Sequence, residues 1–191
     1  MVASRLLTLI LLCLAMAACA ATLPGCDEPA AGGTDASTET VKIGPTTFKL
    51  DLALDDEHRF KGLSGRTDIP ADGGLLFVFP DRAVAKQAFV MRDCPVPIDI
   101  IYLDRSGRIV AMYEMAAETP RTDAEKELSA PAGYPDWAKT NPAYEARLKK
   151  YPSKYAAQFV IELKGGTLKT LGLKEGQKIQ LDTASLKKRA S

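Results

Sequence analysis

The sequence contains few of the residues that metal sites and catalytic dyads need. Its 191 residues include one histidine, His58, and four cysteines, three of which lie within the first 26 residues. One histidine and one further thiol, Cys94, do not provide the ligands of a transition-metal site. A Gly-rich phosphate loop before a helix and a serine nucleophile elbow are also missing from the sequence. We therefore expect no metal and no cofactor.

The chain also lacks an excess of charge of either sign. Arg5 is the only charged residue before Asp27, so the remainder carries 24 basic and 24 acidic residues. Nucleic-acid surfaces require basic residues gathered on one face, and we predict no nucleic-acid partner. The basic residues at the C-terminus lie in a short tail, residues 184–191, which we interpret as a solvated terminus.

The N-terminal segment lacks the length of a membrane span, because its apolar run is short and polar sequence follows soon after. One positive charge, Arg5, precedes the run, and small residues follow it. This order is typical of a secretory signal peptide, which we assign to residues 1–26. Two cysteines, Cys19 and Cys26, end tetrads that resemble the lipidation signal of bacterial lipoproteins.

We predict that either Cys19 or Cys26 is lipidated, with ordinary cleavage and no lipid as the alternative. Residues 27–40 are small and polar, so they are expected to form a flexible tether. The prediction is an exported protein of the bacterial cell envelope, held at the membrane through its lipid anchor.

Residues 41–183 are predicted to form one β-rich domain. Strict alternation over residues 46–54 indicates a half-buried strand, and Asp55 is a candidate N-cap for a short helix. Five further strands are expected at residues 75–79, 88–92, 98–103, 108–115 and 159–163, and a last one at 178–182. No βαβ alternation appears, which favours an antiparallel barrel or sandwich.

A long segment of about residues 120–152 interrupts the strand pattern. It is charged and rich in proline, and it includes Tyr134, Trp137 and Tyr144. Loops of this length are functional or disordered, and the aromatic residues favour partial order. We interpret the segment as a peripheral insertion whose removal leaves most of the stability intact.

Five motifs in the same order are similar to those of the bacterial and archaeal family known as domain of unknown function 192. They are Arg59-Phe-Lys-Gly-Leu-Ser-Gly-Arg66, Gly74-Leu-Leu-Phe-Val-Phe79, Phe89-Val-Met-Arg-Asp-Cys-Pro-Val-Pro-Ile-Asp-Ile-Ile-Tyr-Leu-Asp104, Gly107-Arg-Ile-Val110 and Val160-Ile-Glu-Leu-Lys-Gly165. The resemblance implies a mainly β fold with a short helix, often behind a signal peptide, and it implies no reaction, substrate or cofactor. The chain departs from the family pattern at Val90, at Cys94 and in the insertion.

Asp99 is the most suggestive ionisable residue, because it lies in an apolar strand between Ile98 and Ile100. A buried carboxylate needs a partner, and arginine suits it because the guanidinium binds a carboxylate with two hydrogen bonds. The candidates are Arg66, which we favour, Arg92 and Arg59. A structural ion pair, a pocket for a small polar or anionic ligand, formed by Arg66, Met91 and Asp99, and a catalytic carboxylate all remain open.

Glu162 lies between Ile161 and Leu163 and raises the same question. It could be the second carboxyl of an acid–base pair with Asp99, or it could bind a basic partner at the rim of the sheet. Cys94 is most simply a core residue. A nucleophile activated by Arg92, a pair with His58 and a disulfide with Cys26 are the alternatives.

Two functions of different class follow from these residues. The first is a tethered binding or interaction module of the envelope, whose partner is a small polar or anionic ligand or an envelope protein. The second is an envelope hydrolase or related enzyme that uses Asp99 and Glu162. The two differ in geometry, because an enzyme needs both carboxyls in one open cleft.

Overall fold

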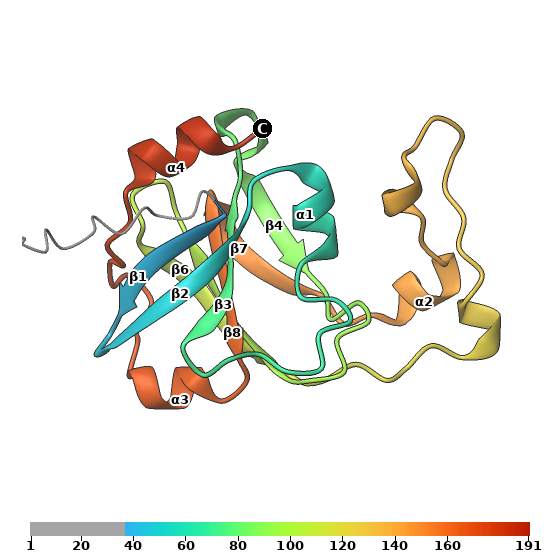
Figure 1. Ribbon diagram of the computed structural model, residues 1–191, viewed down its shortest axis with the longest axis horizontal. Coiled ribbons are helices and arrows are strands. Elements are labelled where there is room, and N and C mark those ends of the chain that lie inside the picture. The colour runs from blue at the N-terminus through green and yellow to red at the C-terminus, as the bar shows by residue number, and fades with distance from the viewer. Residues whose placement is uncertain (1–36) are drawn as a thin grey trace, which may run out of the picture. The chain divides into compact units, whose positions relative to one another are not determined.

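A six-stranded sheet forms the centre of the protein. The computed structural model describes residues 37–191, which belong to one compact unit. The sheet has the strand order β1-β2-β3-β8-β5-β6, and a separate two-stranded sheet pairs β4 with β7 (Figure 1). The strands are β1 (Thr38–Ile43), β2 (Thr46–Ala53), β3 (Gly73–Val78), β4 (Ala85–Phe89), β5 (Ile98–Leu103), β6 (Ile109–Met115), β7 (Tyr151–Ala157) and β8 (Phe159–Lys164).

Short helices lie between and after the strands. They are α1 (Asp56–Lys61), α2 (Pro142–Arg147), α3 (Thr167–Leu171) and α4 (Thr183–Arg189), with single 3₁₀ turns at Asp81–Ala83, Asp123–Glu125 and Asp136–Ala138. Asp55 caps α1 by accepting a hydrogen bond from the His58 N–H, as the sequence predicts. Within residues 37–191, no helix is long and apolar enough to cross a membrane.

The fold is mainly β, which confirms the prediction, but within residues 37–191 the large sheet does not close into an antiparallel barrel. β2 and β3 pair in parallel, so the sheet is mixed, and β1 and β6 are left as its two edges. The parallel pair is made because residues 54–72, which include α1, cross over between the two strands. Periodicity within a strand carries no signal of which neighbour it will pair with.

Both faces of this sheet are covered. One face packs Ile101 and Leu163 against residues of α3 and α4, among them Leu171 and Leu186. The other face packs a second cluster that includes Ile100 against the small sheet and the segment after α1. All six residues of β3 and of β5 are buried, which explains why these strands are apolar throughout except for Asp99 of β5.

Several predicted boundaries differ from the structure. The tether predicted for residues 27–40 overlaps β1, which starts at Thr38, and the tail 184–191 lies largely in α4, whose Leu186 is fully buried. The strand predicted at 88–92 ends at Phe89, and the one at 178–182 is a single bridge between Arg108 and Lys178. The signal peptide, Cys19 and Cys26 lie outside the described residues.

The insertion projects beside the sheet as an arm that carries α2 (Figure 1). It is anchored by Tyr144, which is fully buried and whose hydroxyl accepts a 2.8 Å hydrogen bond from the Asp93 N–H. The guanidinium groups of Arg121 and Arg147 lie 3.8 and 4.6 Å from the centre of the same ring. The insertion is therefore not purely peripheral, because Tyr144 packs it against the domain. Its predicted C-terminal end is also wrong, since residues 151–152 already belong to β7.

We expect Tyr144→Phe to lower the free energy of unfolding by about 1–3 kcal/mol, because the Asp93 N–H loses its acceptor. Tyr144→Ala also removes the buried ring and is expected to cost about 3–5 kcal/mol. Urea unfolding followed by circular dichroism measures both. Tyr134, 62% exposed on the same arm, is the matched control, and its alanine variant should change stability by less than about 0.5 kcal/mol. Equal losses at the two positions would restore the peripheral interpretation.

Candidate functional site

The three residues predicted to bind a ligand do not come together. Arg66 pairs with Asp51 at 2.8 Å, and both side chains are partly exposed. Met91 is buried in the cluster that contains Ile100. Asp99 precedes Ile100 in β5, so its side chain projects from the opposite face of the sheet. The predicted pocket of Arg66, Met91 and Asp99 is not formed.

Asp99 binds the first turn of α3 and does not pair with an arginine. Its Oδ2 atom accepts a 2.6 Å hydrogen bond from the Leu168 N–H, in the first turn of α3. The N-cap residue of α3 is Gly166, which has no side chain to offer, and Asp99 supplies the missing acceptor from the neighbouring strand. Burial raises the pKa of Asp99, and the N–H groups of Leu168 and Gly166 oppose that rise. The predicted arginine partner of Asp99 is wrong: a backbone N–H binds Oδ2, and Oδ1 has no hydrogen-bond partner.

Glu162 and Asp99 face opposite sides of the sheet. In the β5–β8 register Asp99 lies opposite Leu163, and Ile100 lies opposite Glu162. Opposed residues share a face and consecutive residues alternate, so Glu162 projects with Ile100 and Asp99 projects with Leu163. The predicted acid–base pair is therefore wrong, because the whole thickness of the sheet separates the two carboxyls.

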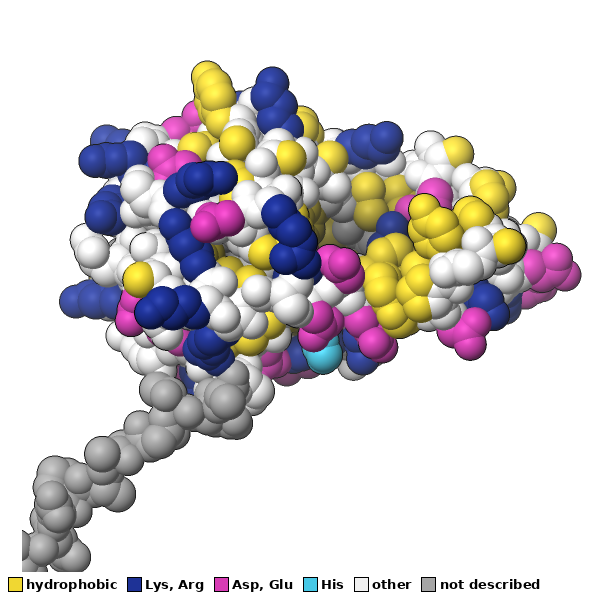
Figure 2. All heavy atoms as spheres, turned by 90° about the horizontal axis from the view of Figure 1, so that it is seen from above, with side chains coloured by type: hydrophobic (Ala, Val, Ile, Leu, Met, Phe, Trp, Pro, Cys, Tyr) yellow, Lys and Arg dark blue, Asp and Glu magenta, His cyan; other side chains and the backbone are white. Residues whose placement is uncertain are grey.

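A cavity of about 380 Å³ lies on the Glu162 face, between α1, the segment that follows it, β3, β4 and the arm. Viewed as in Figure 2, a hollow separates the main body from the arm, and apolar side chains gather on the arm side of it. The aromatic rings that line the cavity are those of Phe60, Phe77, Phe79, Phe89 and Trp137. Phe60 and Trp137 touch across the opening, with ring centres 5.5 Å apart.

Glu162 is one of the lining residues and is only 4% exposed. Its Oε2 atom has no hydrogen-bond partner. Burial raises the pKa of this carboxyl to about 8, although a hydrogen bond from the Leu63 N–H opposes the rise. At neutral pH the group is therefore mainly the uncharged acid, which carries a proton to donate.

Gly62 leaves room beside the carboxyl. Its φ is +52°, a conformation that side-chain-bearing residues rarely adopt, and it ends α1. A Cβ atom built at this position would lie 3.6 Å from Oε2 of Glu162 and 3.4 Å from the Phe77 ring, which are ordinary contact distances. There is thus space for one further atom beside the unpartnered oxygen.

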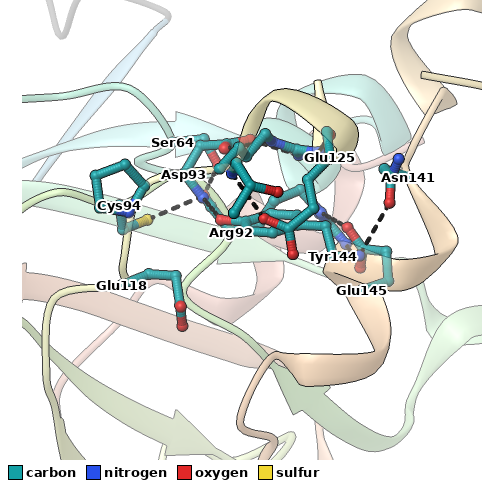
Figure 3. A network of polar contacts seen from close by, with 12 residues as sticks. Ser64, Arg92, Asp93, Cys94, Glu118, Glu125, Asn141, Tyr144 and Glu145 are labelled. Carbon is teal, nitrogen blue, oxygen red and sulfur yellow. Dashed lines mark hydrogen bonds and ion pairs between the residues drawn. The ribbon is translucent and has the colours of Figure 1, made fainter. Parts of the chain in front are cut away.

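The two arginines of the cavity wall are already bound. Arg59 donates to the carbonyl oxygens of Leu54 and Val78 at 2.6 and 2.9 Å, and to Asp56. Arg92 makes a two-point ion pair with Glu145 of the arm at 2.6 and 2.8 Å (Figure 3). Its guanidinium group also stacks on Phe60. Both guanidinium groups are therefore already engaged, and the third cation of the lining, Lys61, is exposed to water.

Cys94 is a buried thiol rather than a nucleophile. Burial raises its pKa to about 12, and nearby Glu162 contributes to the rise. His58 is exposed and binds Asp55 at 2.7 Å, so a Cys–His pair does not form. In the described part of the chain, no group of three or more His, Cys, Asp or Glu side chains is arranged to hold a metal ion.

The sequence pointed to Glu162 but not to its surroundings. Its position between Ile161 and Leu163, in an otherwise apolar strand, was the available signal. The aromatic residues of the cavity come from α1, two different sheets and the arm. No local pattern connects them, so the cavity could not be recognised before the fold.

Comparison with known proteins identifies the family. The model of DUF192, described as uncharacterized ACR, matches residues 38–181. The chain belongs to this family. The comparison with curated proteins gives no match.

Two solved structures share the fold of this DUF192 protein. A putative transcription regulator from Sinorhizobium meliloti is 21% identical, with a TM-score of 0.54 over 75% of this chain and 92% of that chain. A protein of unknown function from Novosphingobium aromaticivorans is 19% identical, with a TM-score of 0.55 over 75% of this chain and 85% of that chain. At this level of identity the likeness extends to the fold alone.

The raised pKa of Glu162 has a measurable effect on stability. The unfolded carboxyl ionises near 4.5 and the folded one near 8, so between these values the folded state keeps a proton that the unfolded state has lost. The free energy of unfolding should therefore fall as pH rises, by about 1.4 kcal/mol per pH unit from this group.

Glu162→Gln removes that titration and retains the shape of the neutral acid. We expect the variant to gain stability relative to the native protein from about pH 5 to about pH 8, with no further gain above it. Urea unfolding at each pH measures the difference. The control is Glu57→Gln, because the Glu57 side chain on α1 is exposed to water. A constant difference across this range would mean that Glu162 is not held neutral by the fold.

Proposed function

We propose that this DUF192 protein is a binding module of the cell envelope, whose site for a small molecule is the cavity at Glu162. The proposal is carried by one observation, a buried carboxyl with an unpartnered oxygen in an aromatic cavity. Buried polar groups are almost always hydrogen-bonded, and exceptions in a cavity suggest a partner that comes from outside. The volume of about 380 Å³ falls within the range of small-molecule pockets.

The hydrolase alternative is not retained. It required Asp99 and Glu162 in one cleft, and the register of β5 and β8 puts them on opposite faces of the sheet. Binding requires only one of the two carboxyls. The residues that we propose for the site are Glu162, the aromatic lining and the segment Gly62–Ser64.

The proposed location is the membrane surface of the envelope, through a lipid on Cys19 or Cys26. Support comes from the sequence, in which Arg5, the apolar run and the two cysteine tetrads follow in the order of a lipoprotein signal. The segment between Cys26 and β1 is short and polar, which suits a tether that keeps the domain clear of the lipid surface.

A thermal-shift screen of the purified protein against envelope metabolites and glycans tests the binding proposal. A ligand that binds only the folded state raises stability by mass action, by roughly 2.7 kcal/mol at a hundred times its Kd. Ala88→Phe places a ring at a position that lines the cavity, whereas Ala85→Phe changes an exposed position of the same strand that does not. We expect the shifts to disappear in the first variant and to persist in the second. Shifts that survive in both would place binding elsewhere.

Metabolic labelling with a palmitate analogue tests the anchor. We expect the label to be lost in one of the variants Cys19→Ala and Cys26→Ala and retained in the other. Label that persists in the double variant, or that is missing from the native protein, would contradict the anchor and leave the binding proposal unaffected.

A further inference from the structure

The chemistry of the cavity restricts what it can bind, provided that the binding function proposed above is correct. The side chain of Glu162 lies in a mostly apolar wall, and its Oε2 atom lacks a partner although an atom-sized space lies beside it. A carboxylic acid in this position has an O–H to donate. The missing partner is therefore a hydrogen-bond acceptor that the chain itself does not supply.

We propose that the cavity binds an uncharged molecule with an apolar body the size of an aromatic ring and one carbonyl-type oxygen, which accepts a hydrogen bond from the neutral Glu162 carboxyl. The ring edges of Phe77 and Phe89, which pack against each other at 4.9 Å between centres, provide contact for the apolar body. Phe60 and Trp137 would cover it from the side of the arm.

Charge on the ligand is disfavoured because the two arginines that line the cavity already have partners. Arg59 and Arg92 are engaged by Asp56, by backbone carbonyls and by Glu145, and Lys61, which also lines the cavity, is exposed to water. An anion in the interior would lose its water without gaining a partner. A ligand with an ammonium group would need Glu162 to ionise and pair with it. Both the ammonium group and the carboxylate would then lose their water in an apolar wall, which costs free energy.

The arrangement makes ligand binding depend on the protonation of Glu162. The titratable and charged groups that line the same cavity or lie against Glu162 are Asp56, Arg59, Lys61, Arg92, Cys94 and Tyr102. Burial raises the pKa of both Cys94 and Tyr102, so neither gains a charge near neutral pH. Glu162, with its pKa raised to about 8, is thus the group that changes charge in this range.

Three probes with one skeleton separate the alternatives: benzylacetone, which carries a ketone, the primary amine that corresponds to it, and butylbenzene. The full chain has a single tryptophan, Trp137, in the cavity lining, so its fluorescence reports binding directly. We expect benzylacetone to bind at least tenfold more tightly than butylbenzene at pH 6. Its affinity should fall about tenfold per pH unit above about 8, because ionised Glu162 no longer donates.

The variant Glu162→Gln keeps a donor without a titration, so it should bind benzylacetone within a few-fold of the native protein and equally at every pH. Glu162→Leu should lose the advantage of the ketone over butylbenzene. Glu57→Gln, at an exposed carboxyl of α1, is the matched control and should retain the pH dependence of the native protein.

Three results would each overturn the inference. The first is that the native protein binds the amine more tightly than benzylacetone and that Glu162→Gln abolishes this binding of the amine. The second is that the native protein binds benzylacetone equally at every pH, and the third is that it does not bind benzylacetone at all. Each of these is distinguishable from failure of the binding function. The screen with Ala88→Phe and Ala85→Phe decides that function separately, since it does not depend on the chemical class of the ligand.

Discussion

Both faces of the six-stranded sheet are covered by packed apolar residues, and the other features of this protein depend on that constraint. Because β5 and β8 are central strands, every side chain on them except that of Lys164 is buried in one of two apolar layers. An ionisable group there loses its water whichever way it points. The two acids of these strands, Asp99 and Glu162, meet that constraint in different ways, since Asp99 accepts backbone hydrogen bonds and Glu162 is held as the neutral acid.

The two acids differ in their surroundings: each has one buried oxygen without a hydrogen-bond partner, but only Glu162 lines the aromatic cavity. Asp99 lies against the start of α3, where N–H groups need acceptors, and the carboxyl that satisfies them stabilises the connection between β8 and α3. Glu162 lies under Gly62 and beside Phe77, where only the Leu63 N–H approaches it. A carboxyl left short of partners beside a cavity is the arrangement found at functional sites more often than in a plain core.

The arm connects this cavity to the rest of the fold through a chain of charged and aromatic contacts. Arg92 binds Glu145 of α2, and the N–H of its neighbour Asp93 binds the hydroxyl of Tyr144 (Figure 3). Arg92 also stacks on Phe60 of α1, and the Asp93 carboxylate binds Arg121. Asp93 has a positive φ of 53°, a conformation that persists where the surroundings hold it. The arm therefore positions one wall of the cavity, although its sequence reads as a surface excursion.

The sequence by itself determined the mainly β class, the short helix capped by Asp55, and most strands of the large sheet, because these depend on local alternation and capping. It also pointed to the family, through five motifs that resemble those of the family in the same order. The partners of each strand, the parallel pairing of β2 with β3 and the burial of Tyr144 were decided only by the tertiary structure, because they join residues far apart in the chain. The same holds for the acids: the sequence placed Asp99 and Glu162 in apolar strands, but only the β5–β8 register showed that they face opposite sides of the sheet. A partner such as the Leu168 N–H of α3 for Asp99, or the lack of one for Glu162, is a property of the packed molecule that no local pattern contains.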